Sequence, residues 1–177
     1  PTGLLMEMDE YLRGRLPPLS GPELRRGIEI ADKRLVSLGI TSVQDATASN
    51  SPDRWDLFGR LKAERAVRPR ITMMAGSGHL TEFLNRGLRF GSGDVRLNIG
   101  AVKIMLTATA GALHPARAGL RSAVRRAHES GFQVAVHAVE AESVAAAAES
   151  LVDAPVYGAS ERPRRRGRIE HCSECPP

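Results

Sequence analysis

Three residues combine side chains that could bind a metal ion with a regular spacing along the chain. Lys103 and His137 lie in apolar segments, His171 lies near the end of a third strand-like segment, and each is 34 positions from the next. Imidazoles that converge at the ends of neighbouring strands are natural ligands for zinc and similar divalent ions. A single strand histidine is more often structural than a ligand, but the matched spacing favours a metal site.

Lys103 is the most informative of the three because lysine is rare in this chain. Only three of the 25 basic residues are lysines, and the other two fall on predicted helices, where they can reach solvent. An unpaired ammonium inside an apolar strand would be costly. Lys103 therefore either points into a polar barrel mouth or is neutralised by a partner or a modification. A structural ion pair with Asp45 or another acid is an alternative.

Alternating helices and strands would position these residues. Ser20 and Glu23 form a capping box before the first helix, and Gly39 suits its C-terminal end. Elsewhere, apolar residues recur at helical spacing or in the unbroken runs typical of buried strands. The predicted helices cover 21–38, 51–66, 81–88, 116–130 and 140–152, the predicted strands cover 40–45, 70–75, 100–106, 133–139 and 168–172, and a loop is predicted over 107–113.

Strands separated by helices of this length predict a parallel sheet with right-handed crossovers. Two α/β architectures fit this order, a doubly wound sheet and a (β/α) barrel. The glycine fingerprint of a dinucleotide-binding fold does not follow the first strand, which favours the barrel. In a barrel, side chains at the C-terminal ends of the strands converge on one site.

The composition narrows the class of protein. The 177 residues carry a net charge of +5, and they contain no run of the ~20 apolar residues that a membrane helix needs. Five arginines between 162 and 168 account for this net charge, and no aromatic residue lies among them. A solvated loop explains these arginines better than a phosphate or nucleic-acid site. We therefore expect a cytoplasmic protein with no nucleic-acid partner and no membrane partner.

Cys172 and Cys175 form a Cys-x-x-Cys pair. The chain has no second pair to complete a structural zinc site, and two cysteines cannot form a disulfide scaffold. Prolines 176 and 177 follow, where a thioredoxin-type motif would open a helix. Two free thiols are the default interpretation, and a redox pair is the alternative.

Four segments of the sequence resemble the amidohydrolase superfamily of metal-dependent hydrolases, and within it the YtcJ-like branch. They are GITSVQD at 39–45, GAVKI at 100–104, GFQVAVHA at 131–138 and RIEHC at 168–172. The resemblance implies that Lys103 is the lysine of the fourth barrel strand, which is carboxylated in many relatives. It implies that His137 and His171 are the metal ligands of the fifth and sixth strands. The implied cofactor is a divalent metal, with zinc expected, as one or two ions.

The sequence also departs from the superfamily pattern. The His-x-His motif of the first strand is absent, and Ala138-Val139-Glu140 replaces the Ile-Gly-Asp of many branch members. The aspartate that serves as general base is expected beyond Pro177, as are the seventh and eighth strands, and the small β-sandwich is missing. We therefore expect residues 1–177 to be an internal segment, about strands 2 to 6 of a partial (β/α)8 TIM-type barrel, and to be inactive in isolation.

The resemblance implies hydrolysis of a non-peptide C–N bond, in an amide or an N-substituted formamide, by metal-activated water. His79 and His114 follow strands on the face where a small-molecule substrate would bind, so they are candidate substrate contacts, although exposed loop histidines are the simpler interpretation. The alternative function is a non-catalytic α/β binding or assembly domain. In either case, open sheet edges favour a homo-oligomer.

Overall fold

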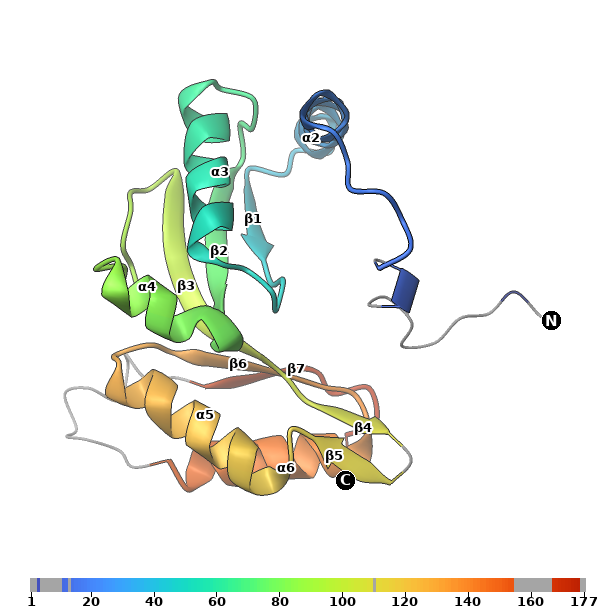
Figure 1. Ribbon diagram of the computed structural model, residues 1–177, viewed down its shortest axis with the longest axis vertical. Helices are drawn as coiled ribbons and strands as arrows, with labels where there is room; N and C mark the ends of the chain where they lie inside the picture. The colour runs from blue at the N-terminus through green and yellow to red at the C-terminus, as the bar shows by residue number, and fades with distance from the viewer. Residues whose placement is uncertain (1–2, 4–10, 13, 110, 155–166, 176–177) are drawn as a thin grey trace.

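Figure 1 shows the computed structural model of the chain, in which residues 3, 11–12, 14–109, 111–154 and 167–175 are described. A five-stranded parallel sheet lies at its centre. Spatial order follows chain order, as in a barrel, so the predicted α/β class and parallel pairing are confirmed. The strands are β1 (Ser42–Asp45), β2 (Arg70–Gly76), β3 (Leu97–Met105), β6 (Val134–Ala138) and β7 (Arg168–His171).

Five helices connect or precede these strands close to the predicted positions. The capping box before the first helix is confirmed, because the Ser20 side chain accepts from the Glu23 amide while Glu23 Oε2 accepts from the Ser20 amide at 2.8 Å. The helices are α2 (Gly21–Ser37), α3 (Pro52–Ala63), α4 (Leu80–Asn85), α5 (Arg117–Glu129) and α6 (Ala141–Val152), and a short 3-10 helix, η1 (Ser77–His79), precedes α4.

The predicted loop over 107–113 is wrong. This segment contains β4 (Thr107–Thr109) and β5 (Ala112–His114), which pair antiparallel as a small separate hairpin. Hydrophobic alternation indicates a strand only over four residues or more, and each of these strands has three residues, so the sequence did not reveal them. The hairpin lies between β3 and α5 and contacts α6.

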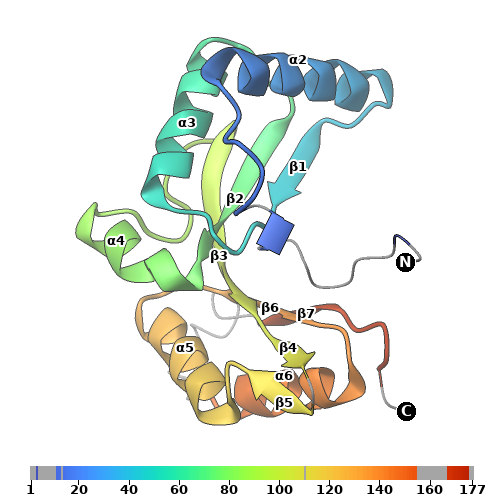
Figure 2. The same cartoon turned by 45° about the vertical axis from the view of Figure 1, so that its right-hand side comes forward.

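The sheet is strongly curled. In Figures 1 and 2, β6 and β7 run at a steep angle to β1 and β2, with α2, α3 and α4 around the upper strands and α5 and α6 beside the lower ones. The result is a parallel half-barrel, which is compatible with part of a TIM-type barrel. None of its helices, within the described residues, has both the length and the apolar character of a membrane-spanning segment.

The two faces of this sheet differ in content. The outer face packs against the helices in the main core, which includes the fully buried side chains of Met73, Val102, Val136 and Phe132. The inner face carries a second, small apolar cluster of Met74, Ala101 and Ala135. Hydrophobic side chains therefore stabilise the fold mainly from the outside of the sheet, which leaves room for polar groups on the inside.

A β-bulge in β3 determines which face Lys103 occupies. Met73 pairs with Ile99, but Ala75 pairs with Val102, so β3 contains one residue more than β2 in this interval. The bulge falls at Gly100, where a Cβ atom would lie only 2.7 Å from Thr72 Cγ2. Because side chains alternate between faces, one inserted residue moves every later side chain to the opposite face. Val102 thus faces the helices, and Lys103 faces the interior.

Candidate active site

Lys103 is buried and paired with an acid. Its side chain is 3% exposed, and its Nζ atom donates to Glu170 Oε2 on β7. Asp45, which the sequence offered as a partner, instead accepts from the amide and the hydroxyl of Thr47, at 3.0 and 2.6 Å. Lys103 therefore both faces the interior of the half-barrel and forms an ion pair, and its acidic partner is Glu170.

Glu170 belongs to a polar network that crosses the inner face of the sheet. Arg168 Nη2 donates to Glu170 Oε1 at 3.0 Å and to Gln44 Oε1 at 2.7 Å. Gln44 lies on β1 and Arg168 on β7, the two edge strands of the sheet. This hydrogen bond therefore links the two edge strands across the inner face of the curled sheet.

His137 and His171 are in direct contact. Their ring centroids lie 4.5 Å apart, and the ring planes meet at 66° in an edge-to-face arrangement. His137 comes from the C-terminal part of β6, and His171 is the last residue of β7. The predicted convergence of these two strand-end histidines is confirmed.

An unusual backbone conformation brings His171 to this position. His171 pairs with Ala138, whose side chain belongs to the main core on the helix-covered face. Strict alternation would place His171 on that same face. Instead His171 has φ 76° and Cys172 has φ 49°, both in the left-handed region that non-glycine residues rarely adopt. This local change of direction allows the His171 ring to meet His137.

The Cα atom of Lys103 lies nearer the N-terminal ends of the strands than the Cα atoms of the two histidines. In register it pairs with Ala135, two residues before His137, so its Cα atom does not lie at the level that equal spacing in sequence suggested. Its partner Glu170, however, is the register partner of His137. The ion pair therefore lies beside the histidines, because the long lysine side chain spans the offset.

The surroundings of two groups shift their pKa values. Burial lowers the pKa of the Lys103 ammonium, and the positive charge of Arg168 lowers it further. The pKa of Glu140, which follows β6, is lowered by hydrogen bonds from its own amide, from the Ser143 hydroxyl at 2.9 Å and from the Ala108 amide, and by the charge of His137. Both shifts arise at the strand ends where the histidines meet.

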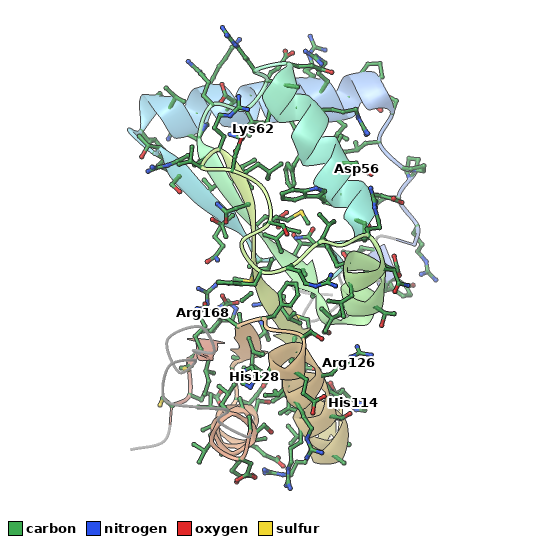
Figure 3. The ribbon with its side chains drawn as sticks, turned by 90° about the vertical axis from the view of Figure 1, so that its left-hand side faces the viewer. Asp56, Lys62, His114, Arg126, His128 and Arg168 are labelled. Carbon is green, nitrogen blue, oxygen red and sulfur yellow. The ribbon has the colours of Figure 1, made fainter. Side chains whose placement is uncertain are left out.

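The two predicted substrate contacts lie on other elements. His79 ends η1, and its Nδ1 atom is 2.9 Å from Glu82 Oε1. His114 is exposed on the hairpin, where it pairs with Thr107. Figure 3 shows His114 well apart from Arg168. Both histidines follow strands of the half-barrel, but each has its own local surroundings.

Sequence patterns missed the network of Arg168, Glu170 and Gln44. Arg168 lies in β7, as the strand predicted over 168–172 requires, but it points inward and is not one of the solvated loop arginines with which its charge was counted. The other four arginines of that stretch lie outside the described residues. A signal was available, since Arg168 and Glu170 stand two residues apart in a strand and must share a face. That pattern could have paired them.

The inner-face donors fit part of a metal centre. The two touching imidazoles offer two nitrogen ligands, the commonest kind in zinc sites. The Lys103 ammonium has no lone pair, so it becomes a ligand only after losing its charge, as in carboxylation. Within the described part of the chain, no three His, Cys, Asp or Glu side chains are grouped as a metal site. Among the described residues, His137 and His171 are thus the candidate nitrogen donors on the inner face, and Lys103 lies beside them as an ion-paired amine.

Comparisons with known proteins identify the family and the fold. Residues 1–175 match the sequence model of the Amidohydro_3 family, described as an amidohydrolase family. A crystal structure of an uncharacterized metal-dependent hydrolase from Pyrococcus horikoshii OT3 has 22% sequence identity and a TM-score of 0.65, with 85% of this chain and 32% of that chain covered. One from Pyrococcus furiosus has 21% identity and a TM-score of 0.67, with 93% and 37% covered.

These structural matches concern the fold, because both identities are low. The chain spans about a third of the length of each solved structure. A search of curated protein sequences gave no match.

Proposed function

Since the chain belongs to the amidohydrolase family, we propose that it supplies one part of the active-site barrel of a metal-dependent hydrolase. The observation that carries the proposal is the contact between His137 and His171 on the interior of the half-barrel, beside the buried amine of Lys103. Parallel barrels place their active sites at this end of the strands. Because the solved structures are about three times as long as this chain, the activity proposed is that of a whole barrel.

In this proposal His137 and His171 bind a divalent metal, with zinc as the expected ion and one or two ions bound. Such an ion polarises a carbonyl group and lowers the pKa of a bound water molecule. The two rings already touch, so little conformational entropy would be lost when both engage one ion. The remaining ligands would come from a His-x-His motif of the first barrel strand, and the general base would be an aspartate of the eighth strand.

Lys103 would join the site through carboxylation. The neutral amine adds carbon dioxide, a nitrogen–carbon bond forms, and one proton is released to solvent. The product is a carbamate anion, whose oxygen atoms are metal ligands. Carboxylation also reverses the charge at this position, so the former partner Glu170 repels the modified side chain, while Arg168 stays bonded to Glu170 and balances its charge.

The proposed substrate is a small molecule with a non-peptide C–N bond, an amide or an N-substituted formamide, as in the YtcJ-like branch. His79 and His114 would contact this substrate from η1, which follows β2, and from the hairpin that follows β3. The proposed location is the cytoplasm, where the free thiols of Cys172 and Cys175 would stay reduced. In this proposal residues 1–177 are inactive in isolation, because the activity belongs to the whole barrel.

Metal analysis of the full-length protein tests this function. His137→Ala and His171→Ala should each lower bound metal at least tenfold and abolish hydrolysis of an amide or formamide substrate. His79→Ala is the matched control: it removes an imidazole outside the metal centre, so metal content should stay at the wild-type level while the KM rises. Wild-type metal content in both strand-end variants would show that the assignment is wrong.

A second candidate is an assembly domain that forms homo-oligomers. The observation in its favour is that β1 and β7 form the two edges of the described sheet, and such edges offer unpaired backbone donors and acceptors. Metal analysis combined with sedimentation distinguishes the two functions, because a domain built only for assembly forms a defined oligomer and binds no metal. A metal-containing protein that is a monomer would exclude this candidate.

A further inference from the structure

Cys172 and Cys175 lie in a tight turn directly after β7. The Cys175 amide donates to the Cys172 carbonyl at 3.2 Å, which closes a four-residue turn. The Cα atoms of the first and last residues of such a turn lie within about 7 Å of each other. Disulfides form at Cα separations in this range. The turn therefore brings the two Cα atoms into the range in which a disulfide can close.

The two thiols differ in their exposure. Cys175 is exposed, whereas Cys172 is half-buried and packs against the main core. A small oxidant in solution would thus reach the Cys175 sulfur first. The neighbouring thiol is then available to resolve the oxidised form, which is the arrangement of a reversible redox pair.

The turn is attached to the end of β6 that carries His137. The Cys172 amide donates to the Ala138 carbonyl at 3.0 Å, and the Glu174 amide donates to the Val139 carbonyl at 3.0 Å. Cys172 also follows His171 directly, and both residues are in the left-handed region. A change in the backbone of Cys172 should therefore alter the backbone of His171 and, with it, the orientation of the His171 ring.

We propose that Cys172 and Cys175 form a peroxide-sensitive dithiol whose closure to a disulfide reorients His171. Hydrogen peroxide oxidises the Cys175 thiol to a sulfenic acid and releases one water molecule. The Cys172 thiol then attacks this sulfur, the sulfur–sulfur bond forms, and a second water molecule leaves. A small thiol reverses the process by exchange and becomes a disulfide itself.

The effect on metal binding rests on the proposed function, whereas disulfide formation does not. The covalent ring that the disulfide closes contains the Cα–C bond of Cys172, so it constrains the ψ angle of Cys172. Cys172 directly follows His171 and is bonded through its amide to the Ala138 carbonyl, next to His137, so strain in the closed ring acts on the backbone that places the His171 ring against His137. Oxidation should therefore disturb the contact between the two imidazoles and weaken any metal site that they share.

Peroxide treatment followed by peptide mass spectrometry tests the dithiol. The reduced, metal-free protein should lose two hydrogens within the peptide that carries both cysteines, and dithiothreitol should restore both alkylatable thiols. Cys172→Ser should instead trap a sulfenic acid at Cys175 that a dimedone probe labels, and Cys175→Ser should be labelled more slowly. Two thiols that stay alkylatable, or that form only intermolecular disulfides, would overturn the proposal.

Two measurements test the link to His171. In the metal-free protein, the NMR signals of the His137 and His171 rings should shift on oxidation and return on reduction. The Kd for Co²⁺ should rise at least threefold on oxidation, and it should not change on the same treatment of Cys175→Ser. Unchanged ring signals would overturn the link even where the disulfide forms. A protein that binds no Co²⁺ in either state but shows the ring shifts would contradict the proposed function alone.

Discussion

The outer and inner faces of one sheet are built by different means. Outside, fully buried apolar side chains such as Met73, Val102 and Val136 pack against helices. Inside, a short apolar cluster gives way to charged residues, where Lys103, Glu170 and Arg168 compensate one another. The outer face supplies most of the stability, because burial of apolar area is the dominant favourable contribution to folding. Burial of the polar groups on the inner face costs free energy, and the apolar packing of the outer face offsets this cost.

The largest expected effect lies on the outer face. Phe132→Ala removes a fully buried ring from the main core and should lower the free energy of unfolding by about 3–5 kcal/mol. Phe90→Ala is the matched control, because Phe90 packs edge-on against Phe132 but is 37% exposed. It should cost only about 1 kcal/mol. Urea denaturation measures both values, and equal costs would show that the outer face is not the main source of stability.

A smaller effect is expected from the bond that crosses the inner face. Arg168→Met and Gln44→Leu each break the hydrogen bond between β7 and β1. The two substitutions should not be additive, and a double-mutant cycle should give a coupling energy of about 1 kcal/mol, since the Arg168 side chain is partly exposed. Arg168→Lys keeps the charge but loses the planar guanidinium, so it should restore little of the coupling. A coupling of zero would contradict a direct contact between the sheet edges.

The smallest effect is a pH dependence at the end of β6. The pKa of Glu140 is lowered, so its carboxylate is favoured in the folded state. The resulting stability is present above the pKa of the unfolded chain, about 4.3, and is lost as the pH falls through the lower folded value. The Tm of Glu140→Gln should therefore decrease less than the wild-type Tm as the pH is lowered below about 5, a limit that follows from the unfolded pKa. Identical curves for the two proteins would show that Glu140 makes no such contribution.

The sequence predicted the outer face far better than the inner face. Apolar periodicity and the capping box of Ser20 and Glu23 placed the five helices α2 to α6 and the five strands of the main sheet, because burial against helices imposes a repeating pattern. The short 3-10 helix η1 was not predicted. The placement of His137 and His171 near the ends of neighbouring parallel strands was predictable from the order of the elements. These features depend on local propensity and on the order of elements, which a single sequence contains.

The inner face depended on local irregularities that no period reveals. The bulge at Gly100 turned Lys103 inward, and the positive φ of His171 redirected its ring. Either feature breaks the alternation on which a sequence argument relies. Glu170 was not identified as the lysine's partner because the two residues lie 67 positions apart and meet only when the sheet curls.

Anomalous diffraction from crystals of the full-length protein grown with zinc tests the central claim most directly. The account predicts a zinc peak on the inner face, about 2.0–2.1 Å from one nitrogen of His137 and one nitrogen of His171. Density for a carboxylated Lys103 next to the same peak would identify the third donor. An inner face without zinc in such crystals, or zinc held by Cys172 and Cys175 instead, would contradict the assignment of this face as a metal centre.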